Sequence, residues 1–332
     1  TSLDDKISGA QFKDTPLRDA LHGAVAVRVI EGFSSEVVTG GLTMFGLTMH
    51  EGAAVLGEAK VFPDGSWLAN VPPYIPVHLQ PIDEFGMAIR SQGLWIQGVP
   101  GEDRRCIGCH ESRIGQGVPR FGQNPTLAEQ NQAQNFVKAI ADREEFPWDK
   151  NDVAGKTYVQ QILDQKCVSC HDASSTDGSP GRAYKVTRTD PATGQTTQYA
   201  IPYFSLSATP IAVYYDQNVK SWNTSYVSIF YPSAMEMGKV TVTGTVPPMW
   251  GVPGSARDSK LIQKINARSI IDGHTAWPTP LHPEDQGAGH EVTDEERRAL
   301  IKVMDLGGQY FARQNSQFKP FTAGNPVAPG TN

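Results

Sequence analysis

The pentapeptides Cys106-Ile107-Gly108-Cys109-His110 and Cys167-Val168-Ser169-Cys170-His171 carry the most structural information in this chain. They contain all 4 cysteines of the sequence, and a histidine directly follows each cysteine pair. Two thiols at this spacing can bond to the two vinyl groups on one edge of a porphyrin, and the next histidine can bind the iron as proximal ligand. The sequence therefore predicts two covalently bound haem c groups. Their predicted attachment and iron-binding residues are Cys106, Cys109, His110, Cys167, Cys170 and His171.

Two other uses of paired cysteines fit the sequence less well. A zinc site with four cysteines commonly has its two C-x-x-C pairs about 15–20 residues apart, whereas 57 residues lie between Cys109 and Cys167. A dithiol redox pair needs no adjacent histidine, and disulfides more often join distant parts of a chain. The histidine after each pair therefore favours haem.

Length and composition indicate an ordered, loop-rich protein of about two domains. The 332 residues are 39% hydrophobic and 19% charged, with 32 Gly, 24 Pro and a formal net charge of −6. This acidic balance argues against a nucleic-acid partner. No apolar stretch approaches the length of about 20 residues that spans a bilayer, so no transmembrane segment is predicted. The first residues lack the basic and apolar regions of a signal peptide, and we expect any export signal to have been removed.

The part of the chain before the first pentapeptide has the pattern of short β-strands. Apolar runs alternate with turn residues over positions 24–71, and the segment from Val61 through Pro63-Asp64-Gly65 to Trp67 predicts a hairpin. Ile75, Val77 and Leu79 then alternate with other residue types. We expect a small antiparallel β module that packs against the first haem.

Helical patterns follow. Thr126-Leu127-Ala128-Glu129 has the sequence of a capping box and predicts a helix towards residue 145. A second helix is predicted over residues 153–167, leading into the second pentapeptide, and a third from Thr293 to Gly307. A hairpin is predicted with arms at 184–190 and 195–200.

The predicted fold class is α+β, with an N-terminal antiparallel β module followed by loop-rich, mainly helical c-type cytochrome haem domains. The predicted domains are residues 1–149, a β-rich module with the first haem c site, and residues 150–332, a cytochrome c-like domain with the second.

The sixth iron ligands decide whether the haems transfer electrons or bind a substrate. For the first haem we favour His78, on a strand-like segment of the β module, with His50 or an open position as alternatives. For the second haem we favour His290, because a ligand just before a capped helix has a fixed backbone and loses little entropy on binding. His274, His282 and Met249 remain alternatives. Arg104, Arg105, Arg113 and Lys166 could pair with haem propionates.

Several short motifs resemble a known family. They are Asp64-Gly65-Ser66, Leu79-Gln80-Pro81-Ile82-Asp83, Pro100-Gly101-Glu102, Cys106-Ile107-Gly108-Cys109-His110-Glu111, Ser259-Lys260-Leu261 and the segment from Thr293-Asp294-Glu295-Glu296 to Asp305-Leu306-Gly307. Together they resemble a bacterial family of multihaem cytochromes, in particular the middle and C-terminal haem domains of the hydrazine synthase alpha subunit. The resemblance implies a β module capping the first haem and a cytochrome c-like domain around the second. In that family a histidine commonly precedes the final capped helix, which adds to the case for His290.

The function favoured by the sequence is electron transfer by a di-haem c-type cytochrome with redox proteins as partners. The alternatives are a haem oxidoreductase, whose open first haem acts on a small nitrogen, oxygen or sulfur compound, and a subunit of an extracellular cytochrome filament. In a filament, self-association would bring haems of neighbouring chains together. The bacteria that have this family of cytochromes attach haem c on the outer side of the cytoplasmic membrane. The resemblance therefore implies a periplasmic or extracellular protein.

Overall fold

The computed structural model describes residues 23–33, 45–93, 95–105, 125–148, 158–173, 182–215, 218–233, 240–245, 247–266, 282–283, 287 and 289–313. The chain divides into two compact units. Unit 1 consists of Thr1–Gly32 and Ala54–Glu144, and unit 2 consists of Phe33–Ala53 and Glu145–Asn332. Each unit is therefore assembled from two separate stretches of the chain.

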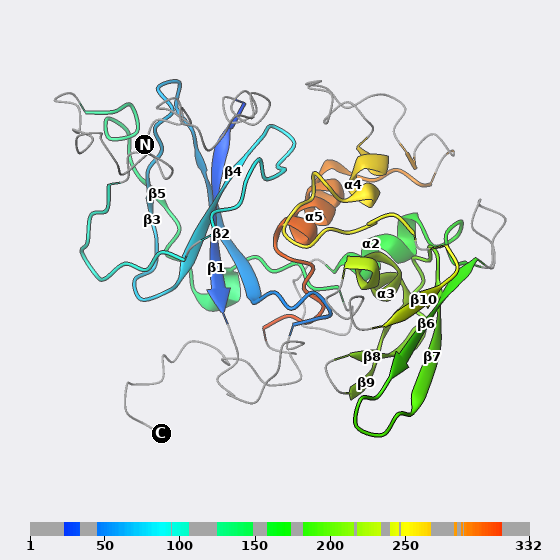
Figure 1. The fold of residues 1–332 in the computed structure, drawn as a ribbon. Helices are drawn as coiled ribbons and strands as arrows, with labels where there is room; N and C mark the ends of the chain where they lie inside the picture. The colour runs from blue at the N-terminus through cyan, green and yellow to red at the C-terminus, as the bar shows by residue number, and fades with distance from the viewer. Residues whose placement is uncertain are drawn as a thin grey trace, which may run out of the picture. The chain divides into compact units, whose positions relative to one another are not determined.

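A three-stranded sheet forms the centre of unit 1 (Figure 1). Its strands are β1 (Ala26–Phe33), β2 (Gly52–Lys60) and β4 (Val77–Ile82), in the order β2-β1-β4. β1 and β4 are antiparallel, with Ala26 opposite Ile82 and Glu31 opposite Val77. The apolar core of this unit contains Val29, Leu56, Ala59, Val77 and Phe136.

Gln80 is a fully buried polar residue of this sheet. Its Oε1 accepts a hydrogen bond from Arg28 Nη1 (3.2 Å), and its Nε2 donates to Ser91 Oγ (2.8 Å). Arg28 is also fully buried and pairs with Glu58 at 3.0 Å. The buried charge and amide are therefore hydrogen-bonded, as buried polar groups require.

Two predicted elements of unit 1, a hairpin and a helix, are wrong. Phe62, Gly65 and Ser66 form a turn, with Gly65 at φ 74°, but the following strand β3 (Ala69–Asn70) pairs in parallel with β5 (Gln134–Asn135) rather than forming a hairpin with β2. The helix expected after Thr126 is absent from the described residues 125–148, which contain turns, β5 and the 3-10 helix η1 (Ile140–Asp142). The run from Glu129 to Asn135 has Ala133 as its one apolar residue. A helix there would have no apolar face to bury.

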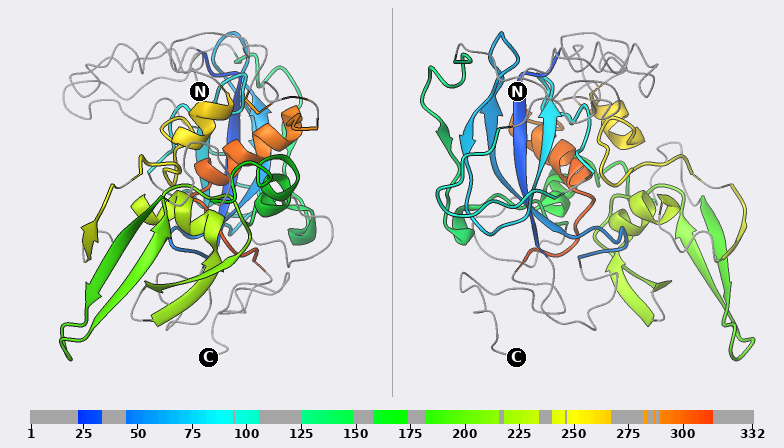
Figure 2. Two further views of the ribbon diagram at one scale, coloured as in Figure 1. Left: turned by 90° about the vertical axis from the view of Figure 1, so that its right-hand side faces the viewer. Right: turned by 60° about the vertical axis from the view of Figure 1, so that its left-hand side comes forward.

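Strands also make up much of unit 2. β6 (Ala183–Thr189), β7 (Thr196–Pro202) and β10 (Thr241–Thr243) form a sheet in the order β10-β6-β7. The β6–β7 pair confirms the predicted hairpin. Its turn lies at the end that projects away from the helices of unit 2 (Figures 1 and 2). Two further strands, β8 (Pro210–Tyr215) and β9 (Asn218–Asn223), pair antiparallel.

The α-helices of unit 2 are short. They are α2 (Val159–Lys166), α3 (Thr224–Phe230), α4 (Lys260–Ile265) and α5 (Asp294–Asp305), and η2 (Tyr231–Ser233) is a 3-10 turn. α2 confirms the helix that leads into the second pentapeptide. α5 has the predicted Thr293–Glu296 capping box and ends before Gly307, at φ 96°.

The predicted fold class is therefore wrong. The described part of the chain consists mostly of strands and loops, not of mainly helical domains, and its longest helix, α5, has 12 residues. The residues of β6 to β9 explain the difference, because they are rich in Val, Ile, Thr, Tyr and Trp, which favour pleated structure. Two stretches of this kind form the antiparallel pair β8–β9, which was not among the predicted elements.

Candidate functional site

The second pentapeptide begins where α2 ends. The N–H groups of Cys167 and Val168 both donate to Leu163 O, and the N–H groups of Cys170 and His171 donate to Cys167 O. The motif thus continues the helix as a tight turn. Cys167 is partly exposed and Cys170 is exposed, so both thiols lie at the protein surface. This arrangement leaves the thiols accessible for covalent attachment.

Aromatic side chains support the ring of His171 on one side. The Phe204 ring lies edge-on to it, with ring centroids 5.1 Å apart, and Trp250 packs against Phe204 at 4.3 Å. Trp250 is held in turn by a hydrogen bond from its Nε1 to Tyr203 O (3.2 Å). On the main chain, Leu206 N donates to His171 O at 2.7 Å. One segment, residues 203–206, therefore supports both the ring and the backbone of His171.

A second imidazole lies beside that of His171. The ring centroids of His171 and His282 are 6.1 Å apart, and their planes are inclined by 69°. Imidazole nitrogens bind first-row metal ions at about 2 Å, and the ring centre lies about 1 Å beyond the nitrogen, so two histidines on opposite faces of one iron have centroids about 6 Å apart. The spacing, the two thiols and the aromatic surroundings therefore fit a haem c between these two rings.

The structure also describes two of the other candidates for the sixth ligand at the second pentapeptide. His290 Nδ1 is 3.2 Å from Lys166 O, at the end of α2. Lys166 Nζ is 4.0 Å from Glu296, the capping residue of α5. Met249 is 53% exposed, and its carbonyl accepts from Lys260 N. His274 lies outside the described residues.

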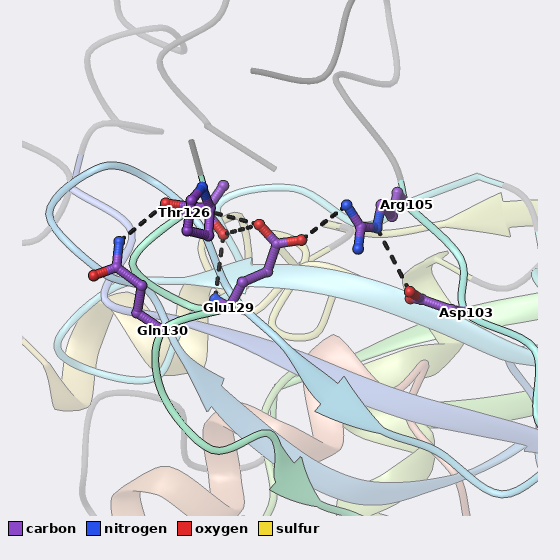
Figure 3. Close-up of polar contacts among 6 residues, drawn as sticks. Asp103, Arg105, Thr126, Glu129 and Gln130 are labelled. Carbon is purple, nitrogen blue, oxygen red and sulfur yellow. Dashed lines mark hydrogen bonds and ion pairs between the residues drawn. The ribbon is translucent and has the colours of Figure 1, made fainter. Parts of the chain in front are cut away.

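The first pentapeptide, with Cys106, Cys109 and His110, also lies outside the described residues, as does Arg113. An ion pair joins Arg105, just before the pentapeptide, to Glu129, which follows it in the sequence (Figure 3). Arg105 Nη1 lies 3.0 Å from Glu129 Oε1, and Arg105 Nε lies 3.5 Å from Asp103. Glu129 accepts from Thr126 N (2.9 Å), while Glu129 N donates to Thr126 Oγ1 (3.3 Å). These two hydrogen-bonded residues form the predicted capping box, although a turn follows instead of a helix.

The basic and hydrogen-bonding neighbours of Glu129 and Glu102 stabilise the charged form of each carboxyl group. Hydrogen bonds donated by the Thr126 backbone and hydroxyl, together with the charge of Arg105, lower the pKa of the exposed Glu129 carboxyl. Arg104 Nε likewise donates to Glu102 at 2.6 Å and lowers the pKa of that carboxyl. The candidate propionate partners Arg104, Arg105 and Lys166 therefore each have a carboxylate of the protein beside them.

The two histidines considered for the first haem lie in different units. His78, in β4 of unit 1, stacks on Trp95 with ring centroids 4.6 Å apart and planes inclined by 12°. His50 belongs to unit 2 and packs against Gly307, where an added Cβ would lie 2.5 Å from His50 Cγ. Burial lowers the pKa of His50 despite the neighbouring Glu51.

Residues 24–111 match the family model of the hydrazine synthase alpha subunit middle domain. The structure is similar to that of hydrazine synthase from Kuenenia stuttgartiensis, with a TM-score of 0.51 and 17% sequence identity. The match covers 88% of this chain and 40% of that chain, so the present chain spans less than half the length of its structural relative. A comparison with the sequences of curated proteins gives no match. The resemblance to hydrazine synthase inferred from the short motifs is thus supported by both the family model and the fold.

Two further findings concern metal binding and membranes. Within the ranges that the structure describes, no group of three or more His, Cys, Asp and Glu residues is arranged to hold a metal ion. In the same ranges, no helix has the length and apolar character needed to cross a membrane.

Sequence reasoning missed Phe204, Trp250 and Leu206, which contact His171 or its supporting segment. They lie far from the pentapeptide in sequence, and no spacing rule connects them to it. Gln160, a fully buried amide of α2, was also missed. Its spacing of three positions from Leu163, which places it beside an apolar position of the predicted helix, was the available signal.

Proposed function

We propose that this protein is a c-type cytochrome that carries two covalently bound haem c groups and transfers electrons. The observation that carries the proposal is the imidazole pair of His171 and His282, with ring centroids 6.1 Å apart, beside a surface thiol pair at the end of α2. The second haem would be attached to Cys167 and Cys170 in residues 150–332. The first would be attached to Cys106 and Cys109 in residues 1–149, with His110 as its proximal ligand.

His282 is the sixth ligand that we propose for the second haem. Its ring centroid lies 6.1 Å from that of His171, a spacing that would suit two histidines holding one haem iron. His290, favoured from the sequence, stays the alternative, because a hydrogen bond from its Nδ1 to Lys166 O would orient Nε2 as in many metal-binding histidines. A haem held by His171 and His282 would supply reversible one-electron chemistry. If His282 is the ligand, His290 stabilises the end of α2 through its contact with Lys166 O, directly before Cys167.

His78 remains our proposal for the sixth ligand of the first haem. It lies on β4 of unit 1, the unit that also contains the chain just before and after the first pentapeptide. We further propose a periplasmic or extracellular location and redox proteins as partners. The chemistry of haem c attachment and the likeness to hydrazine synthase support these last two points.

Haem counting tests the proposal directly. The pyridine haemochrome spectrum of the wild-type protein should give two haems per chain, and the double variant Cys167→Ala/Cys170→Ala should give one. The reduced wild-type protein should show the sharp α-band of haem c. Absence of that band would refute the proposed function.

Single substitutions separate the two candidate ligands. His282→Ala should convert the second haem to high spin, while His290→Ala should leave it low spin. Met249→Ala, at an exposed position, is the matched control and should leave the spectrum unchanged. A high-spin spectrum in His290→Ala together with a low-spin spectrum in His282→Ala would restore the assignment favoured by the sequence.

A further inference from the structure

The side chain of Gln160 uses its full hydrogen-bonding capacity inside unit 2. Its Oε1 accepts from Ser225 Oγ and from Asn223 Nδ2, the latter at 3.1 Å. Its Nε2 donates to Asp164 Oδ1 (2.8 Å) and to Leu206 O (3.0 Å). An amide offers two acceptor sites and two donors, so all four are occupied. Gln160 is fully buried, with 0% relative exposure.

These partners fix the orientation of the amide. The Asn223 amide nitrogen can only donate, so it requires the oxygen of Gln160. The Leu206 carbonyl can only accept, so it requires the nitrogen of Gln160. Reversing the amide would place donor against donor and acceptor against acceptor in a buried site, where each unsatisfied group costs about 1–3 kcal/mol.

The hydrogen bonds continue from Gln160 to the proximal histidine through one residue. Leu206 accepts from Gln160 at its carbonyl and donates its own N–H to His171 O at 2.7 Å. Two positions earlier, the Phe204 ring packs edge-on against the His171 ring. The position of the segment carrying Phe204 and Leu206 therefore determines how His171 is held.

Gln160 is itself held from the opposite side. Trp148 Nε1 donates to Ser225 Oγ (2.8 Å), and Tyr310 donates from its hydroxyl to Asn223 Oδ1 (2.9 Å). Trp148 is fully buried, and Tyr310 is 5% exposed. The amide thus links a rigid buried network to the residue that bonds His171.

We propose that Gln160 is a positioning residue for His171, acting through Leu206 to set the orientation of the proximal imidazole at the second haem. This inference rests on the proposed function, since it assigns the network to the haem attached at the second pentapeptide. Outer partners of this kind orient the ligands of metal centres, and their loss commonly changes metal affinity or activity about 10–100-fold.

The test replaces Gln160 by Met, which keeps the approximate volume and removes both donors and the acceptor. Gln80→Met is the matched control, because Gln80 is an equally buried amide in unit 1. Both variants are compared with the wild-type holoprotein by electron paramagnetic resonance and by hydrogen exchange. The signal of the second haem is identified as the one lost in Cys167→Ala/Cys170→Ala.

We expect Gln160→Met to shift the low-spin g values of the second haem and to speed exchange at the Leu206 amide about tenfold or more. Gln80→Met should leave both unchanged, even if it lowers stability by a similar amount. Should Gln160→Met fail to fold, Gln160→Glu replaces it, because it places an oxygen against Leu206 O and should shift the same signal.

The outcomes separate the two proposals. If wild-type protein contains haem c at the second pentapeptide and the Gln160 variants leave its g values unchanged, the positioning role is refuted while the proposed function stands. The positioning role is also refuted if Gln80→Met shifts the signal equally. If the wild-type protein contains no haem there, the proposed function fails first.

Discussion

Gly307 and Gly289 have nearly the same backbone angle and very different surroundings. Their φ values are 96° and 97°, in the region that favours glycine. A Cβ at Gly307 would lie 2.5 Å from His50 Cγ, whereas a Cβ at Gly289 would have nothing within 4 Å. Comparing the two positions therefore separates backbone strain from steric conflict.

We predict that Gly289→Ala lowers the free energy of unfolding by about 1 kcal/mol through backbone strain alone. Gly307→Ala should lower it by about 2–4 kcal/mol, because the methyl group also displaces the His50 ring. Chemical denaturation of both variants measures the difference. Equal losses would show that His50 moves aside at no cost.

His50 also makes stability depend on pH. Burial depresses its pKa in the folded protein below the ordinary value of 6.5, and Glu51 opposes this shift in part. The unfolded chain therefore binds more protons as the pH falls below 6.5, and the contribution of neutral His50 is full above that pH and decreases below it. We predict that His50→Gln flattens the dependence of unfolding free energy on pH below about 6.5. An unchanged slope would assign the dependence to other groups.

At the scale of elements, two capping boxes with the same T-x-x-E pattern have different outcomes. Thr293 and Glu296 cap α5, which buries Ala299, Leu300, Ile301, Val303 and Met304. Thr126 and Glu129 make the same reciprocal hydrogen bonds but are followed by a turn. A cap therefore begins a helix only where an apolar face follows it.

We predict that Thr293→Ala lowers the free energy of unfolding by about 1 kcal/mol and reduces helical circular dichroism. Thr126→Ala should change stability by about 0.5 kcal/mol or less and leave the helical signal unchanged, because it caps an exposed turn. Thermal unfolding followed at a helical wavelength distinguishes the two. A matching loss of helical signal in Thr126→Ala would contradict this explanation.

Turn residues, caps and apolar periodicity therefore predicted a helix or strand correctly where the apolar positions of that element are also buried in the fold. The β6–β7 hairpin and α5 could be read from turn residues, a cap and periodic apolar positions. The parallel pairing of β3 with β5 could not, because it joins residues more than 60 positions apart. The same limit applies to the site: the pentapeptide identified His171, but its neighbours Phe204 and His282 come together only through the fold.

At the scale of the whole molecule, residues 33–53 belong to unit 2 although they precede most of unit 1 in sequence. Ala53 N donates to Gln309 Oε1 at 2.9 Å, and Tyr310 N donates to Phe45 O at 2.6 Å. Leu47 N donates to the Tyr226 hydroxyl, and the Leu47 side chain is fully buried. Unit 2 is therefore incomplete without this segment.

We predict that residues 145–332 expressed alone are digested by trypsin faster than the same residues in the full chain, because the surface that buries Phe45 and Leu47 is exposed. A peptide of residues 33–53 added in trans should restore resistance. The control is a peptide of the same composition in scrambled order. Full resistance of the fragment without any peptide would show that residues 33–53 are dispensable for unit 2.

The same division has a consequence for the order of events at the ribosome. Residues 33–53 are synthesised long before Gln309 and Tyr310, which bind them. At about 5–20 residues per second, the interval is roughly 10–50 s. During that time Phe45 lacks Tyr310 and Ala53 lacks Gln309, although Tyr226, which binds Leu47, is made earlier. The residues of unit 1 are already available to one another. A nascent chain of this protein therefore presents one short apolar segment to the chaperones that survey emerging polypeptides until Gln309 and Tyr310, just after α5, have been made.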